Sequence, residues 1–304
     1  MSGTQSSYLK KFIDEKENNG NKASQTRDNE PDDKVTDLGS VSELKFMPIN
    51  TEEMPCKWFY PAGTTVFIRP ADVEEIQAFS VVDDSNFYDI FDKVNYMISK
   101  CVYMKEPDGT RRSHKYIVDG DRWYLLFAIR DLTFQKGNDL LTKADGSDVQ
   151  IPIKRGNFKF HEMSDKIAKY YDKVNGVFNV KTKIGDFTLA PPTLGVQKSF
   201  SDYVLKNIKS GAAPDQSFLK IVPYTLPHRT SVTEEGIKKY INEYKNMSKE
   251  EFQFLNQIVD IMKFGIKGVY SFDESGEEVH STNVFPTGIS GLFVESDTID
   301  DYLI

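Results

Sequence analysis

The strongest fold signal in this chain is the stretch Asp119-Gly-Asp-Arg-Trp-Tyr-Leu-Leu-Phe-Ala-Ile-Arg-Asp-Leu-Thr-Phe134. It holds seven consecutive apolar or aromatic residues, 123–129, between Arg122 and Arg130. A run this apolar is expected to be buried, and the arginines at its ends then need acceptors or water. We predict that the stretch forms a central packing helix from Asp121 to about residue 132, with Asp119 or Asp121 as its cap.

Three arginines beside apolar segments, Arg69, Arg122 and Arg130, have two interpretations. They could clamp a carboxylate or phosphate ligand. They could instead form ion pairs where elements pack, because a planar guanidinium suits partly buried pairs. We expect this second, structural role. The nearest carboxylates in the sequence are Asp72, Asp121 and Asp131.

Composition excludes several classes of protein. The chain has 304 residues, a formal net charge of -8 and only two cysteines, Cys56 and Cys101. The acidic balance argues against broad nucleic-acid affinity, and two cysteines make neither a disulfide framework nor a zinc site. No apolar run approaches the roughly 18 residues that span a membrane, and no secretion signal follows Met1. We expect reduced thiols, no membrane contact and synthesis in a cytoplasm.

The order of the sequence signals predicts an α+β fold in which helices pack with short antiparallel strands and a β-hairpin lies near the C-terminus. We assign an N-terminal α+β lobe to residues 44–172 and a C-terminal helical lobe with the hairpin to residues 173–294, and the two could form one continuous domain. Within the first lobe, segments 149–153 and 158–160 read as strands of one hairpin.

Both ends of the chain read as tails. Residues 1–43 are polar and acidic, with too few apolar side chains to offset the entropy of ordering, and residues 295–304 are an acidic terminus. Each tail could be inert or could bind a partner as a short peptide. The apolar side chains that would make such contacts are Tyr8, Leu9 and Phe12 in the first tail and Ile299, Tyr302 and Leu303 in the second.

Motifs that carry chemistry are absent from the sequence. No two of the 4 histidines lie within four residues of one another, and there is no Cys-x-x-Cys pair, phosphate loop or nucleophile elbow. The pair Asp83-Asp84 is expected to cap a helix rather than hold a cation. We therefore predict no catalytic residue, no cofactor and no metal. Three or more polar residues converging in a deep pocket would favour an enzyme instead.

Three segments together resemble the tail baseplate hub assembly proteins of T-even-type contractile phages. They are Thr65-Val-Phe-Ile-Arg-Pro70, Ile98-Ser-Lys-Cys-Val102 and Asp121–Phe134. In that family a strand ending in Arg-Pro precedes a helix that ends near Cys-Val, and a helix with an aspartate, an apolar run and an arginine follows. Residues 266–293 are similar to the family's terminal hairpin, so the resemblance covers about residues 63–293. Related proteins often carry Cys-x-x-Cys pairs in two loops where this chain has none, which puts any metal role in doubt.

The resemblance implies a non-enzymatic protein of baseplate assembly. It would be a hub subunit or an assembly chaperone that binds other tail and baseplate hub proteins or the tape-measure protein. Its place would be the host cytoplasm during assembly, and the virion if it is retained there. One alternative is a permanent structural virion protein of the tail or head–tail connector. Another is a phage accessory enzyme or nucleic-acid accessory protein.

Overall fold

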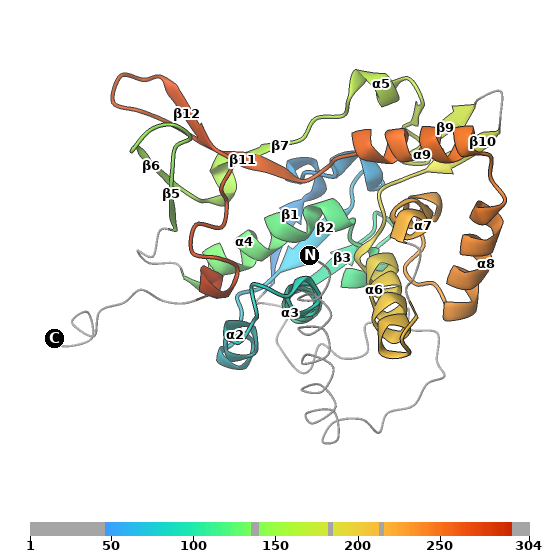
Figure 1. The fold of residues 1–304 in the computed structure, drawn as a ribbon. Helices are drawn as coiled ribbons and strands as arrows, with labels where there is room; N and C mark the ends of the chain where they lie inside the picture. The colour runs from blue at the N-terminus through green and yellow to red at the C-terminus, as the bar shows by residue number, and fades with distance from the viewer. Residues whose placement is uncertain (1–45, 135–139, 182–184, 213–215, 294–304) are drawn as a thin grey trace.

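The computed structural model describes residues 46–134, 140–181, 185–212 and 216–293, which form a mixed α+β fold (Figure 1). The predicted fold class is therefore confirmed. The helices are α2 (Val73–Ser80), α3 (Phe87–Cys101), α4 (Arg122–Thr133), α5 (Asp165–Ala168), α6 (Leu194–Lys209), α7 (Gln216–Ile221), α8 (Glu234–Lys245) and α9 (Lys249–Ile261).

The strands are short and pair antiparallel, and those in the described parts of the chain form four sheets with the orders β1-β2-β3-β4, β10-β9-β8, β12-β11-β7 and β5-β6. Their bounds are β1 (Met47–Asn50), β2 (Thr65–Ile68), β3 (Val102–Lys105), β4 (Arg111–Ser113), β5 (Leu141–Lys143), β6 (Gln150–Pro152), β7 (Phe158–Phe160), β8 (Tyr171–Asp172), β9 (Val177–Lys181), β10 (Asp186–Leu189), β11 (Ile266–Phe272) and β12 (Glu278–Ser281). Within the described ranges, no helix has the length and apolar character needed to cross a membrane.

Helix α4 lies in the middle of the molecule, between the β5–β6 and β11–β12 strands on one side and helices α6–α8 on the other (Figure 1). It begins one residue after the predicted start, and every residue from Tyr124 to Arg130 is buried. Aromatic rings from distant segments pack against it: the ring centroid of Phe285 lies 5.0 Å from Trp123, and that of Phe158 lies 5.1 Å from Phe127. The helix is buried nearly all round because its sequence is apolar nearly all round.

The segments around β2, the end of α3 and the end of α4 pack as one unit. Helix α3 runs directly into β3, which pairs with β2 so that Ile68 faces Val102. The Arg69 N–H donates to the Cys101 carbonyl at 3.0 Å. The N–H of Ala71 donates to Thr133 Oγ1 at 2.9 Å. These bonds join three stretches that are far apart in the sequence.

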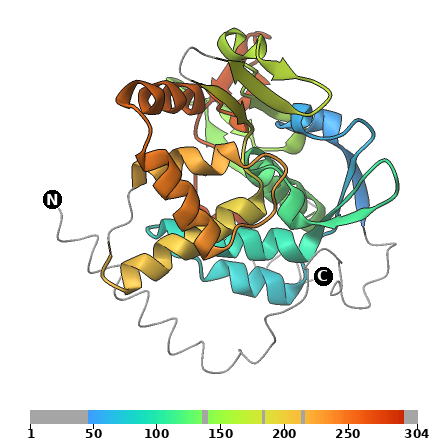
Figure 2. The same ribbon diagram turned by 90° about the vertical axis from the view of Figure 1, so that its right-hand side faces the viewer.

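One hydrophobic core runs through both predicted lobes. It contains buried side chains from Ile49 near the N-terminal sheet to Phe293 at the end of the described chain. Strand β7 of the first lobe also pairs with β11 of the second, with Phe158 opposite Val269. A second, smaller core joins α6, α7 and α8, and Figure 2 shows helices α6–α9 gathered on one face. The described parts of the two lobes therefore share a continuous interior.

Two local predictions are wrong. The predicted hairpin around residues 155–157 does not form, because β6 pairs with β5 whereas β7 pairs with β11. Helix α3 is capped by Asn86, whose side chain accepts from Tyr88 N at 3.0 Å, and not by Asp84. The Asp84 carboxylate instead accepts hydrogen bonds from the N–H groups of Ile289 and Ser290 at 3.0 and 2.9 Å. It therefore joins the turn before α3 to a segment near the C-terminus.

Candidate functional site

Arg69 makes the most complete ion pair of the three predicted arginines. Its Nη1 and Nη2 lie 2.9 and 2.5 Å from the two carboxylate oxygens of Glu75 in α2. Both side chains are buried, with 5% and 7% of their surfaces exposed. Asp72, the partner suggested by the sequence, lies 3.4 Å away and is exposed. Glu75 was not among the predicted partners, although its spacing from Asp72 is that of a capping box.

Arg122 and Arg130 mark the two ends of α4 and are also buried. Arg122 pairs with Asp119 rather than Asp121, and its guanidinium lies 4.1 Å from the ring centroid of Phe91 in α3. Arg130 Nε donates to the Leu292 carbonyl at 2.9 Å. Each arginine thus connects α4 to another part of the chain. The predicted partner-binding residues Tyr8, Leu9, Phe12, Ile299, Tyr302 and Leu303 lie outside the described residues.

Of the two predicted caps, Asp119 or Asp121, Asp121 occupies the N-cap position of α4, but its side chain makes no capping hydrogen bond. It is fully buried and accepts hydrogen bonds from Cys56 N at 2.8 Å and from the Tyr60 hydroxyl at 2.6 Å. The Tyr60 oxygen in turn accepts from Val118 N at 3.0 Å. Burial raises the pKa of Asp121 to about 7, although the bonds from Tyr60 and Cys56 favour its ionised form. The carboxylate therefore fixes residues 56–60 against the start of α4.

We expect Asp121 to make the stability of the protein depend on pH. An unperturbed aspartate titrates at 3.8, so between about pH 4 and 7 the folded state holds a proton that the unfolded state has released. The free energy of unfolding should fall by up to about 4 kcal/mol across this range as pH rises. Asp121→Asn should make this slope shallower in urea denaturation, because only the contributions of other buried aspartates such as Asp119 and Asp131, whose pKa burial also raises, would remain. Asp148→Asn, at an exposed aspartate, should keep the slope. An unchanged slope in Asp121→Asn would contradict this prediction.

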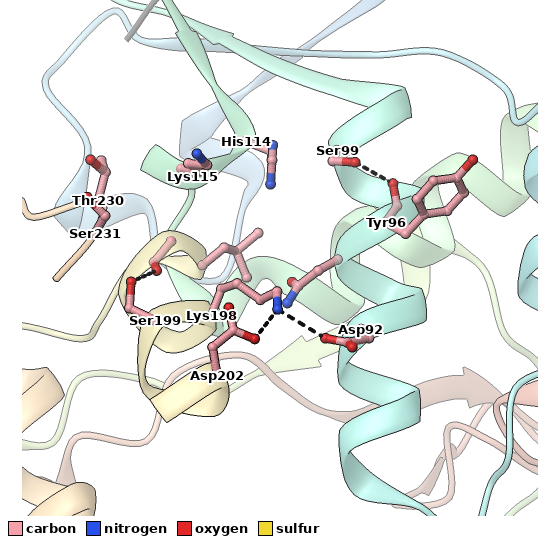
Figure 3. A pocket seen from close by; sticks show the side chains of 13 residues that line it. Asp92, Tyr96, Ser99, His114, Lys115, Lys198, Ser199, Asp202, Thr230 and Ser231 are labelled. Atoms are coloured by element: carbon pink, nitrogen blue, oxygen red, sulfur yellow. Dashed lines mark hydrogen bonds and ion pairs between the residues drawn. The ribbon is translucent and has the colours of Figure 1, made fainter. Parts of the chain in front are cut away.

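A polar cleft of about 530 Å³ opens between α3 and α6 (Figure 3). Four segments line it: α3, residues 114–115, the start of α6, and the loop at 230–231. Its charged and polar side chains include Asp92, Asn95, His114, Lys115, Lys198 and Asp202.

Close backbone packing shapes one end of this cleft. Thr193 caps α6, its hydroxyl donating to the Arg229 carbonyl at 2.7 Å and accepting from Val196 N at 3.3 Å. Gly195 follows in the first turn, and a Cβ atom there would lie 1.8 Å from the Thr230 carbonyl oxygen. Glycine is therefore required at position 195 for the 230–231 loop to approach the helix.

Lys198 crosses the cleft from α6. Its ammonium pairs with Asp202 on the same helix and lies 3.5 Å from Asp92 of α3 (Figure 3). Asn95 lies one turn further along α3 and is buried. This site was not predicted from the sequence, because its walls come from segments that are distant in sequence. The available signal was Asn95 itself, a polar residue within the apolar series Phe91, Val94 and Ile98.

Within the described ranges, no three His, Cys, Asp or Glu side chains are grouped closely enough to hold a metal ion. The cleft offers hydrogen-bonding groups and charges of both signs, an arrangement suited to binding a polar ligand. The chain matches no family model, no curated protein and no solved structure.

Proposed function

We propose that this protein is a non-enzymatic assembly protein of a contractile phage tail baseplate, a hub subunit or assembly chaperone that binds hub or tape-measure proteins. The observation that carries this proposal is the packed unit of β2, α3 and α4. The three segments that resemble the baseplate hub assembly family are joined there by the Arg69–Cys101 and Ala71–Thr133 hydrogen bonds. The contact between these three segments supports a shared fold as the source of the resemblance. Short sequence segments that match by chance have no reason to lie together in the structure.

A surface for the partner is suggested by exposed apolar side chains at α2 and the start of α3, which we call the α2–α3 surface: Val73, Val81 and Phe87. Their exposed fractions are 70%, 69% and 67%. Large exposed aromatic and aliphatic side chains are typical of interfaces. Helix α2 lies at the edge of the molecule, where a second protein can reach it (Figure 1).

The experiment is co-purification of the tagged protein with the tail proteins of the same phage. We expect a hub or tape-measure protein to be retained by the wild type and lost with Phe87→Asp, because a charge replaces an apolar anchor. Val174→Asp is the matched control, since Val174 is exposed but lies away from this surface, in the turn between β8 and β9. Retention of the same partner by Phe87→Asp would remove this surface from the proposal, and retention of no tail protein by the wild type would overturn the proposal.

Mass spectrometry of purified particles separates a transient assembly chaperone from a subunit that stays in the virion. A purely transient chaperone should be missing from mature virions. Presence at a fixed ratio to other tail proteins would exclude a transient role and would fit either a hub subunit or the alternative, a permanent structural protein of the tail or head–tail connector.

The polar cleft favours a second candidate function, an accessory enzyme or nucleic-acid accessory protein. Asp92, His114, Lys115 and Lys198 converge there, which is the arrangement that would favour an enzyme. Titration with ATP and with single-stranded DNA tests this candidate. Saturable binding that is lost with Lys198→Met would favour it over the assembly proposal.

A further inference from the structure

Asn95 is an unusual residue for the buried face of α3. It lines the polar cleft with 7% of its surface exposed, and neither Nδ2 nor Oδ1 has a hydrogen-bond partner among the described residues. A buried carboxamide without partners lowers the stability of a fold. Leucine has the same branching at Cγ and would not carry that penalty. Both amide atoms are covered by their neighbours, so a ligand in the cleft reaches them once those side chains move aside, and it then supplies the missing partners.

We propose that the cleft between α3 and α6 binds an extended peptide through its main chain, with Asn95 bonded to the N–H and C=O of one peptide residue. In an extended chain these two groups of a single residue point to the same side, which is why paired strands exchange both bonds at one position. A carboxamide presents a donor and an acceptor side by side and matches that pair. Peptide binding in this cleft is independent of the proposed role in a phage baseplate.

The shape of the cleft suits an extended chain. Asp92, Asn95, Tyr96 and Ser99 of α3 line one wall at helical spacing, so a single helix face forms it. The start of α6 forms the opposite wall. The volume of about 530 Å³ lies in the range of sites that enclose a small ligand or a short peptide segment.

The charges in the cleft favour a peptide over a polyanion. Lysines 115 and 198 are accompanied by Asp92 and Asp202, so neither sign dominates. Lys198 is already paired with both aspartates. A phosphate site normally gathers basic groups without such carboxylates. An adenine edge also matches a carboxamide, and this makes a nucleoside the competing outcome of the test.

The probe is N-acetyl-trialanine amide, which offers a main chain without distinctive side chains. We expect a saturable shift of the Asn95 side-chain amide signals in NMR spectra of the full chain at millimolar probe. Asn95→Leu should weaken probe binding by roughly tenfold, since two hydrogen bonds are lost. A probe that is N-methylated at the central residue lacks the N–H and should bind equally poorly. Asn256→Leu is the matched control, because Asn256 Oδ1 is also unpaired but lies outside the cleft.

Melting temperatures separate a binding role of Asn95 from a structural one. Asn95→Leu should melt at or above the wild-type temperature, because it removes an unpaired buried amide. A lower melting temperature with a perturbed amide spectrum would show that Asn95 supports the fold, and would overturn the proposal. So would a shift caused by adenosine but not by the peptide, or no shift with either probe.

Discussion

Gly195→Ala is expected to lower the free energy of unfolding by about 3 kcal/mol or more, near the upper end for overpacked sites. The added Cβ would lie 1.8 Å from the Thr230 carbonyl oxygen and 2.9 Å from Lys115 Cβ. The first of these is a backbone atom, so relief requires the 230–231 loop to move away from α6. The same movement should widen the polar cleft and lower its affinity for any ligand.

Urea denaturation of Gly195→Ala beside Gly156→Ala measures this effect. A Cβ atom at position 156 would have no heavy atom within 4 Å, and the φ of Gly156 is not in the left-handed region, so its replacement removes a glycine without a clash. That control should be neutral or slightly stabilising, because alanine restricts the unfolded chain. Equal stability of the two variants would show that α6 and the 230–231 loop do not pack as described.

Arg69→Met is expected to lower the free energy of unfolding by about 3–5 kcal/mol, the usual effect of leaving one buried charge without its partner. Glu75 would keep a carboxylate with only 7% of its side chain exposed. The nearby Cys101 thiol, 3.5 Å from Glu75, is buried and cannot replace a cation. The connection between residue 69, just after β2, and helix α2 should loosen as a result.

The double variant Arg69→Met/Glu75→Leu separates this charge effect from simple loss of packing. We expect it to recover most of the stability, because both charges leave the interior together. Recovery should fall short by about 1 kcal/mol, since Glu75 also accepts from Asp72 N at 2.7 Å in the capping box of α2. Lys143→Met, which breaks the exposed pair with Asp148, should change nothing measurable. A double variant no more stable than Arg69→Met would contradict this account.

Local signals predicted the helices well. The apolar run at 123–129 located α4 to within one residue. Helix α9 begins with a capping box between Ser248 and Glu251, which is a spacing that a sequence displays directly. The hairpin predicted near the C-terminus is present as β11 and β12, which flank a Gly-containing turn. Each of these features depends on residues that are close in sequence, which is why pattern alone sufficed.

Long-range pairing could not be predicted in the same way. Strand β7 looked like the partner of β6, yet it pairs with β11, more than a hundred residues later in the chain. Asp121 looked like a helix cap, yet its carboxylate binds Cys56 N and the Tyr60 hydroxyl. The residues next to Asp121 in the sequence indicate a helix cap. The hydrogen-bond donors at residues 56–60 are distant in sequence and reach Asp121 only in the folded protein.

The polar cleft could not be predicted from the sequence for the same reason, since it depends on contacts between distant residues. Its walls meet because Val118 bridges to Thr193 and because Gly195 admits the 230–231 loop. Neither contact has a sequence signature. The cleft and the α2–α3 surface also use different residues, so a baseplate partner and a peptide in the cleft can be tested separately.

The most direct test of the proposed assembly function is complex formation between the purified full-length protein and purified hub and tape-measure proteins of the same phage, measured by size-exclusion chromatography with light scattering. We expect a complex of defined mass with at least one of them, which Val174→Asp preserves and Phe87→Asp weakens. Separate elution of the wild-type protein from every hub and tape-measure protein would contradict it.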